Sequence, residues 1–225
     1  MTCFTLNGKP ANSQLPASTR LSDVLRIEMG LPGTKIGCNA GDCGACSVLL
    51  DGAPICSCLT AIAQVEGAAV TSIEGLHADG TIAKLQDSFL AHGAAQCGIC
   101  TPGMMVAASA LLAENPAPNR QDVENALGGV LCRCTGYSKI IDAVLAVGGD
   151  AKISPRPQAG QNVGSPIRHL DGQPKVDGSL IYGDDAVPQD ALLVRVIRSP
   201  HHYSSFKIGD KAGFLASHPG ILAVL

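Results

Sequence analysis

The sequence contains no tryptophan, and its aromatic residues amount to only 3% of 225 residues. So few rings argue against a surface on which nucleic-acid bases stack. The formal net charge is −3 and no basic stripe stands out, so neither nucleic acid nor an anionic membrane is an expected partner. No apolar run is long enough to span a membrane, and the first residues lack the pattern of a secretion signal. We therefore expect no membrane insertion and a cytoplasmic location, unless a partner carries the chain to the periplasm.

Cysteine, in contrast, is abundant and clustered. Five of the ten cysteines lie in "GCNAGDCGACSVLLDGAPICSCL", residues 37–59. "QCGIC" contains Cys97 and Cys100, and "LCRC" contains Cys132 and Cys134. Without an export signal, these residues are not expected to form disulfides. Reduced thiols that cluster in this way indicate metal ligands.

The first cluster has the spacing of a plant-type ferredoxin. Cys38, Cys43 and Cys46 form C-x4-C-x2-C, and Cys58 follows on a later segment. Four thiolates spaced like this hold a [2Fe–2S] cluster, and the intervening glycines allow the backbone to approach it closely. We expect Cys43 and Cys46 to share one iron, and Cys38 to share the other with the later cysteine. Zinc fits less well, because structural zinc sites are usually built from two short C-x(2–4)-C knuckles.

Two cysteines compete for the fourth position in this first cluster. Cys56 and Cys58 are two residues apart, so on a strand they face the same side. Their spacing leaves both possible. Cys3 has no partner in the sequence, and we expect it to be a small buried hydrophobic residue.

The second set of cysteines predicts four thiols held between two helices. The C-x2-C and C-x-C spacings of this set suit either a second [2Fe–2S] cluster or a zinc site. The spacing alone does not decide between these metals.

The periodicity of the chain changes from strand-like to helical near residue 78. Before that point, "TCFTLNG", "CSVLLDGAPIC" and "AAVTSI" predict strands with hairpin turns, and "STRLSDVLRIEMG" predicts one helix. After it, four segments with helical periodicity follow: "TIAKLQDSFLAHG", "PGMMVAASALLAEN", "RQDVENALGGVL" and "YSKIIDAVLAVGG". Residues 149–165 are rich in proline and glycine and predict a linker. The later segment "ALLVRVIRS" is strand-like.

Three motifs, "GCNAGDCGACSV", "QCGICTPGMM" and "LCRCTGY", closely resemble the iron–sulfur subunits of the molybdenum hydroxylases, the family of xanthine dehydrogenase and aldehyde oxidoreductase. The resemblance covers residues 1 to about 150. It implies an α+β fold: a β-grasp, plant-type ferredoxin domain at 1–77, then a four-helix [2Fe–2S]-binding domain at 78–148. It also implies two [2Fe–2S] clusters. Their ligands would be Cys38, Cys43, Cys46 and Cys58 in the first domain, and Cys97, Cys100, Cys132 and Cys134 in the second.

The resemblance also assigns individual roles. It places Cys58, which precedes Leu59, at the family's last N-terminal ligand and leaves Cys56 spare. Gln96 matches a glutamine that touches the family's molybdopterin dinucleotide, and Cys134 would be linked to the pterin by a hydrogen bond through its sulfur. Ala40 stands where the family commonly has glutamate, which we expect to affect only the fine tuning of the potential.

Residues 166–225 resemble the opening of the family's large molybdenum-binding subunit, in "R-x-L-D-G", "Y-G-D-D", "R-S-P-H" and "H-P-G-I-L-A-V-L". This implies that the linker at 149–165 leads into a partial α+β segment that a partner chain completes. The expected partner is a large molybdenum-binding subunit, with the molybdopterin dinucleotide bound at the interface.

The function implied is that of an electron-transfer subunit of an oxidoreductase complex. Electrons from the molybdopterin centre would pass through both clusters to a flavin subunit, a cytochrome or another external acceptor. The reaction on the partner would be oxidative hydroxylation of an aldehyde or an N-heterocycle. The alternative is a stand-alone two-cluster ferredoxin or a zinc-stabilised interaction module.

Overall fold

The chain divides into two units by its internal contacts. In a computed structural model, the described residues are 1–78, 80–148, 157–165, 167–188 and 190–225. The larger unit is Met1–Ala186 and the smaller is Val187–Leu225. The predicted linker, 149–165, lies partly outside the described residues. Among the described residues, no helix combines the length and hydrophobicity that crossing a bilayer requires.

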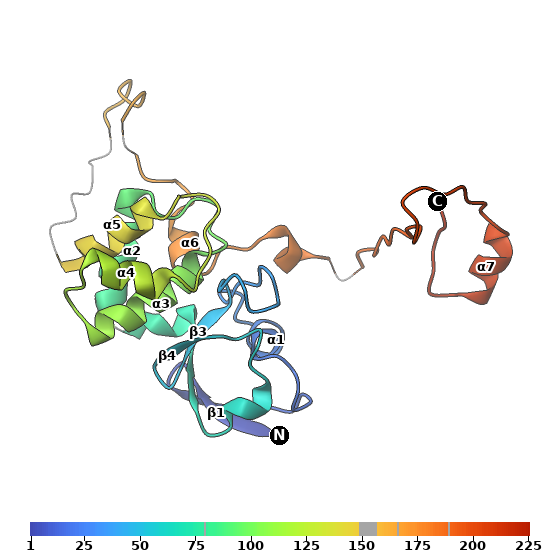
Figure 1. The fold of residues 1–225 in the computed structure, drawn as a ribbon, viewed down its shortest axis with the longest axis horizontal. Helices are drawn as coiled ribbons and strands as arrows, with labels where there is room; N and C mark the ends of the chain where they lie inside the picture. The colour runs from blue at the N-terminus through green and yellow to red at the C-terminus, as the bar shows by residue number, and fades with distance from the viewer. Residues whose placement is uncertain (79, 149–156, 166, 189) are drawn as a thin grey trace. The chain divides into compact units, whose positions relative to one another are not determined.

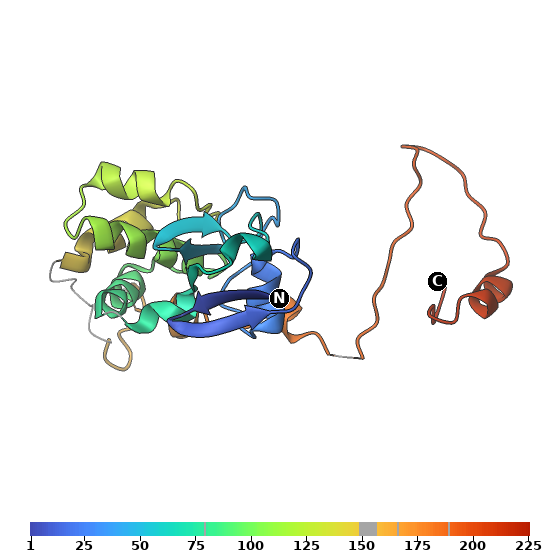
Figure 2. The ribbon, with the colours of Figure 1, turned by 90° about the horizontal axis from the view of Figure 1, so that it is seen from below.

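The larger unit begins with a five-stranded sheet (Figure 2). Its order is β2-β1-β5-β3-β4, and β1 and β5 pair in parallel. Both predicted hairpins form, because Asn7-Gly8 and Asp51-Gly52 take the positive φ angles that two-residue hairpin turns need. The strands are β1 (Thr2–Leu6), β2 (Lys9–Ser13), β3 (Ser47–Leu50), β4 (Ala53–Cys56) and β5 (Ala69–Thr71).

The helix that covers this sheet is less regular than predicted. It starts as α1 (Leu21–Asp23) and widens into a π-helical turn, η1 (Val24–Glu28), in place of one continuous α-helix. Its apolar side is placed as predicted: Leu21, Val24 and Leu25 are fully buried in the core of the sheet domain. The 3-10 segment η2 (Ile62–Val65) completes this core, whereas Ile73 and Leu76 of the next 3-10 segment, η3 (Ile73–Ala78), pack in the core of the helices.

Four helices form the second half of the larger unit, as predicted (Figure 1). They pack around their own hydrophobic core, separate from that of the sheet. The third predicted segment ends earlier than expected, because the chain leaves the helix at Gly128. The helices are α2 (Gly80–His92), α3 (Thr101–Glu114), α4 (Arg120–Leu127) and α5 (Ser138–Leu145), with η4 (Ala146–Gly148) after them.

The predicted final segment, 166–225, is divided in the structure. Its first part contains α6 (Gln173–Val176) and η5 (Gly183–Ala186) and belongs to the larger unit. Val176 is completely buried in the core of the helical domain, where α6 packs against α2 and α3. The boundary between the two units thus follows residue 186 and not the predicted linker.

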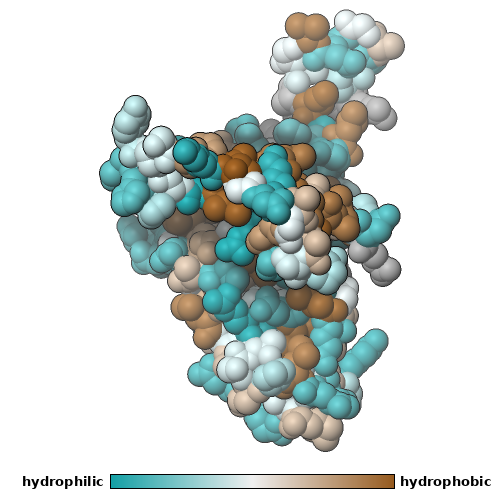
Figure 3. All heavy atoms as spheres, turned by 90° about the vertical axis from the view of Figure 1, so that its right-hand side faces the viewer, coloured by the Kyte–Doolittle hydropathy of each residue, from teal (hydrophilic) through white to brown (hydrophobic). Residues whose placement is uncertain are grey.

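The smaller unit contains α7 (Lys211–Ser217) and no strand among its described residues. The strand-like segment 191–199 is irregular, since an isolated strand without hydrogen-bonded neighbours is not stable in water. Figure 3 shows hydrophobic residues open on the surface among polar ones. In this unit the exposed large hydrophobic residues include Leu192, Leu193, Val194, Val196, Ile197, Tyr203, Phe206 and Leu222.

The burial of Val176 predicts that residues after the linker stabilise the helical domain. Val176→Ala should lower the free energy of unfolding by about 2 kcal/mol, because it leaves a cavity in a packed core. Val163→Ala is the matched control: that side chain is 101% exposed, so its change should stay within about 0.5 kcal/mol. Urea unfolding of both variants provides the measurement. Equal stability of the two would show that α6 does not belong to the core.

Candidate metal centres

The loop that carries Cys38 and Cys43 directs backbone N–H groups at sulfur. The N–H groups of Ala40, Asp42 and Cys43 donate to Cys38 Sγ at 3.3, 3.3 and 3.4 Å. The N–H of Cys38 donates to Cys43 Sγ at 3.3 Å. Hydrogen bonds from Ala40 and then Cys43 lower the pKa of Cys38 to about 7, which favours the thiolate that binds metal. Gly37 keeps this loop tight, because a Cβ there would lie 2.9 Å from Cys43 Sγ.

Cys46 and Cys58 form a second, buried pair beside this loop. Each is only 2% exposed. Burial, followed by a hydrogen bond with Cys46, raises the pKa of Cys58 to about 11. The thiols are therefore paired as Cys38 with Cys43 and Cys46 with Cys58. We expected Cys43 and Cys46 to share one iron. The geometry instead favours Cys43 with Cys38, because backbone N–H groups of the loop donate between these two residues and hold them together.

Cys56 lies in the same neighbourhood. It ends β4, is half-buried, and its Sγ is 3.9 Å from the carbonyl oxygen of Gly41. Burial raises the pKa of Cys56, while a hydrogen bond with Cys46 acts in the opposite direction. Both Cys56 and Cys58 thus contact Cys46, and the choice of Cys58 as the fourth ligand stays a prediction.

Cys3, by contrast, lies outside both groups. It is exposed, so the expectation of a buried hydrophobic residue was wrong. The alternation of β1 explains this, because Thr2, Phe4 and Leu6 face the core and leave Cys3 on the solvent side.

The helical domain also brings its four cysteines together as two pairs. Cys100, just before α3, is buried and shares a hydrogen bond with Cys132. Cys97 and Cys134 share another, and both are exposed. Burial raises the pKa of Cys100. Burial acts in the same direction on Cys132, but hydrogen bonds from Thr135, whose Oγ1 lies 3.1 Å from Cys132 Sγ, leave the pKa of Cys132 lowered.

The arrangement of the cysteines in pairs indicates whether they suit a single metal ion or a [2Fe–2S] cluster. Among the described residues, no three or more His, Cys, Asp or Glu side chains gather as ligands of one metal ion. A [2Fe–2S] cluster spreads four thiolates over two irons. Two thiol pairs per domain, with N–H donors aimed at sulfur in the first, fit that group.

One edge of the helical-domain group is open to solvent. Gln96 and Cys97 are exposed in the loop before α3, and Cys134 is exposed beside Cys97. Gln96, Cys97 and Cys134 thus form a solvent-accessible edge of this group, here called the rim. The family resemblance predicts that these residues contact the pterin or hold the cluster next to it.

The two cysteine-bearing loops touch through their backbones. The N–H of Leu131 donates to the carbonyl oxygen of Cys43 at 2.9 Å, and Leu131 immediately precedes Cys132. Gly44 has a φ of +65°, and a Cβ there would overlap the carbonyl oxygen of Gly129. One hydrogen bond therefore links the carbonyl group of Cys43, a ligand candidate in one domain, to Leu131, the neighbour of a ligand candidate in the other.

Two family models together match residues 4–145. A 2Fe-2S iron-sulfur cluster binding domain matches residues 4–71, and a [2Fe-2S] binding domain matches residues 72–145. Both matches are to iron–sulfur domains, as the cysteine spacing predicts for the first set and the family resemblance for the second.

Curated relatives fall into two length classes. The nicotine 6-hydroxylase small subunit of Paenarthrobacter nicotinovorans is 46% identical, over 62% of this chain and 84% of that protein. The aldehyde oxidoreductase of Megalodesulfovibrio gigas is 36% identical over 99% of this chain, which spans only 26% of that protein. Residues beyond the two iron–sulfur domains thus also have a counterpart in a longer relative.

The similar solved structures also include a longer and a shorter protein. The aldehyde oxidoreductase from Desulfovibrio gigas has a TM-score of 0.73 and 40% identity, over 82% of this chain and 22% of that one. Quinoline 2-oxidoreductase from Pseudomonas putida 86 has a TM-score of 0.61 and 50% identity, over 65% of this chain and 91% of its own.

The contacts of Cys56 and Cys58 lead to a paired test. Cys58→Ser should eliminate the N-terminal cluster, because it removes the buried partner of Cys46. Cys56→Ser should leave both clusters in place. Iron and sulfide analysis with electron paramagnetic resonance (EPR) of the reduced variants distinguishes them. If the cluster were lost in Cys56→Ser alone, or equally in both variants, Cys58 would not be the single fourth ligand.

Proposed function

The chain belongs to the xanthine dehydrogenase and aldehyde oxidoreductase family of molybdenum hydroxylases, as its iron–sulfur part, and we propose that it conducts electrons from a molybdopterin centre to an acceptor. It is thus a component of an oxidoreductase complex. The chain spans about a quarter of the aldehyde oxidoreductase it matches, so the hydroxylation itself is assigned to residues outside this sequence.

The backbone contact between the two cysteine-bearing loops is the observation that carries this proposal. Each domain offers four thiols for a [2Fe–2S] cluster, which when bound takes up and releases one electron at a time. The hydrogen bond from Leu131 to the Cys43 carbonyl, together with the close approach at Gly44, holds the two loops against each other. Direct backbone contact between the two loops suits transfer of electrons between the centres that they would hold.

The exposed rim of the helical domain is the proposed entry side. Gln96 would contact the molybdopterin dinucleotide, and Cys134 would accept a hydrogen bond from it through sulfur. Both residues are exposed, which leaves them accessible to a cofactor held by a partner. Electrons would then reach the cysteines of the helical domain first and those of the sheet domain second.

The exposed Cys38 side is the proposed exit. Cys38 is the solvent-facing thiol of the N-terminal group, while Cys46 and Cys58 are buried. An acceptor that docks here, a flavin subunit or a cytochrome, would meet the cluster where the least protein covers it.

The proposed main partner is a large molybdenum-binding subunit. Residues 187–225 expose many large hydrophobic side chains and contain no strand among those described. Such surface is typical of a segment that packs into another body. We expect a permanent contact that exceeds the ~1,600 Å² of a standard interface. The substrate class is an aldehyde or an N-heterocycle, as the names of nicotine 6-hydroxylase and aldehyde oxidoreductase suggest for those relatives.

Metal content provides the first test of this function. The purified protein should contain two [2Fe–2S] clusters, hence about four irons and about four labile sulfides per chain. Reduction should produce two distinct EPR signals. Stoichiometric zinc, or a single signal, would contradict the proposal.

The hydrogen bond between the loops allows a second test. Leu131→Pro removes the N–H that donates to the Cys43 carbonyl, so electron exchange between the clusters should slow. Leu131→Ala removes the same exposed side chain but keeps the N–H, and should exchange electrons at the wild-type rate. Pulse radiolysis with spectral detection measures these rates once EPR has shown both clusters to be intact. Equal rates in the two variants would exclude this route.

A further inference from the structure

Residues 172–186, here called the strap, lie against the loop that carries Cys97. Gln86 Nε2 donates to the Val176 carbonyl of the strap at 3.3 Å. The hydroxyl of Tyr182 donates to the carbonyl oxygen of Cys97 at 2.7 Å. Gly98 has a φ of +92°, and a Cβ there would lie 2.5 Å from the Tyr182 oxygen. The strap is thus in direct contact with the backbone of a cluster-ligand candidate.

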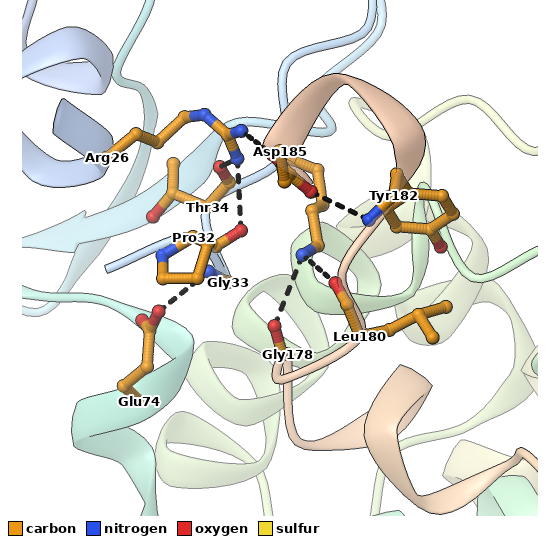
Figure 4. A network of polar contacts seen from close by, with 10 residues as sticks. Arg26, Pro32, Gly33, Thr34, Glu74, Gly178, Leu180, Tyr182 and Asp185 are labelled. Carbon is orange, nitrogen blue, oxygen red and sulfur yellow. Dashed lines mark hydrogen bonds and ion pairs between the residues drawn. The ribbon is translucent and has the colours of Figure 1, made fainter. Parts of the chain in front are cut away.

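The strap is also tied to the sheet domain by two basic side chains (Figure 4). Lys35 Nζ donates to the carbonyl oxygens of Gly178 at 3.2 Å and Leu180 at 2.7 Å. Arg26 forms an ion pair with Asp185. The ammonium group of Lys35 therefore points toward the strap and away from the loop that carries Lys35 itself.

The charge of Lys35 is buried and lies close to Tyr182. The side chain is only 1% exposed, and the ion pairs found among the described residues do not include it. Its Nζ lies 5.3 Å from the centre of the Tyr182 ring, a distance at which a cation is attracted to the ring face. Burial lowers the pKa of Lys35, and the carboxylate of Asp185 counteracts that shift. Lys35, Tyr182 and Cys97 thus form a chain of contacts from a buried cation to a cluster-ligand candidate.

We propose that Lys35 and Tyr182 are positioning residues that raise the reduction potential of the cluster at Cys97, Cys100, Cys132 and Cys134. This inference rests on the proposed function, in which these four cysteines hold a cluster. Reduction adds negative charge to a cluster, so a buried cation nearby stabilises the reduced form. The hydroxyl of Tyr182 directs the positive end of its dipole at the Cys97 peptide and fixes the position of that loop. A higher potential at the entry cluster would favour uptake of electrons from the partner.

Redox titration of the full chain in its complex, followed by EPR of both clusters, tests this proposal. Lys35→Met should lower the equilibrium constant for reduction of the helical-domain cluster on the order of tenfold. For a one-electron couple, that corresponds to a fall of about 59 mV in its reduction potential. Lys35→Arg keeps the charge and should retain most of the wild-type potential. Tyr182→Phe should produce a smaller fall, with altered g values for the same signal. The signal of the N-terminal cluster should change less in each variant.

Val176→Ala is the control for a purely structural role. It loosens the packing of the strap but alters neither Lys35 nor Tyr182, so the potential should stay at the wild-type value. The inference would be overturned if Val176→Ala lowered the potential as much as Lys35→Met does. It would also be overturned if the potential were unchanged in Lys35→Met and Tyr182→Phe, or if the N-terminal cluster shifted more than the helical-domain cluster. If Lys35→Met fails to assemble, Tyr182→Phe decides it, because an unchanged potential in that variant overturns the inference. Absence of both EPR signals from the wild-type protein would instead refute the proposed function itself.

Discussion

Backbone N–H groups that point at cysteine sulfur are the interaction on which this structure depends. Three of them converge on Cys38 and make its thiolate accessible near neutral pH. Such an arrangement requires a loop with no room for side chains inside it, which explains glycine at position 37. The sheet and the helices each hold one of the two cysteine-bearing loops, and each of the two domains has a hydrophobic core of its own.

The second constraint is that the two loops stay in contact. The Leu131–Cys43 hydrogen bond and the close packing at Gly44 act at the backbone, where little can move. The strap adds contacts from a segment far along the sequence, with Val176 anchored in one domain and Lys35 reaching from the other. Residues beyond the two iron–sulfur domains therefore contribute to the environment of the centres. This contribution would be missing from a chain that ended near residue 150.

Local patterns in the sequence predict most of the fold. The hairpin turns, the four helices and the two groups of thiols follow from periodicity, turn residues and cysteine spacing. What the sequence could not predict depends on contacts between distant residues. The pairing of Cys38 with Cys43 follows from how the loop folds back, and the exposure of Cys3 from which face of β1 meets the core. The strap was missed because a short helix with one buried valine has no periodic signal, and the strand-like segment 191–199 lacks a neighbouring strand with which to pair.

The order in which the two centres are reduced tests the central claim most directly. The purified complex would be mixed with the aldehyde or N-heterocycle that reduces it, frozen at successive times and examined by EPR. If electrons enter at the rim formed by Gln96, Cys97 and Cys134, the signal of the helical-domain cluster should rise first and that of the N-terminal cluster second. A signal that starts at the N-terminal cluster would contradict this account of the electron path.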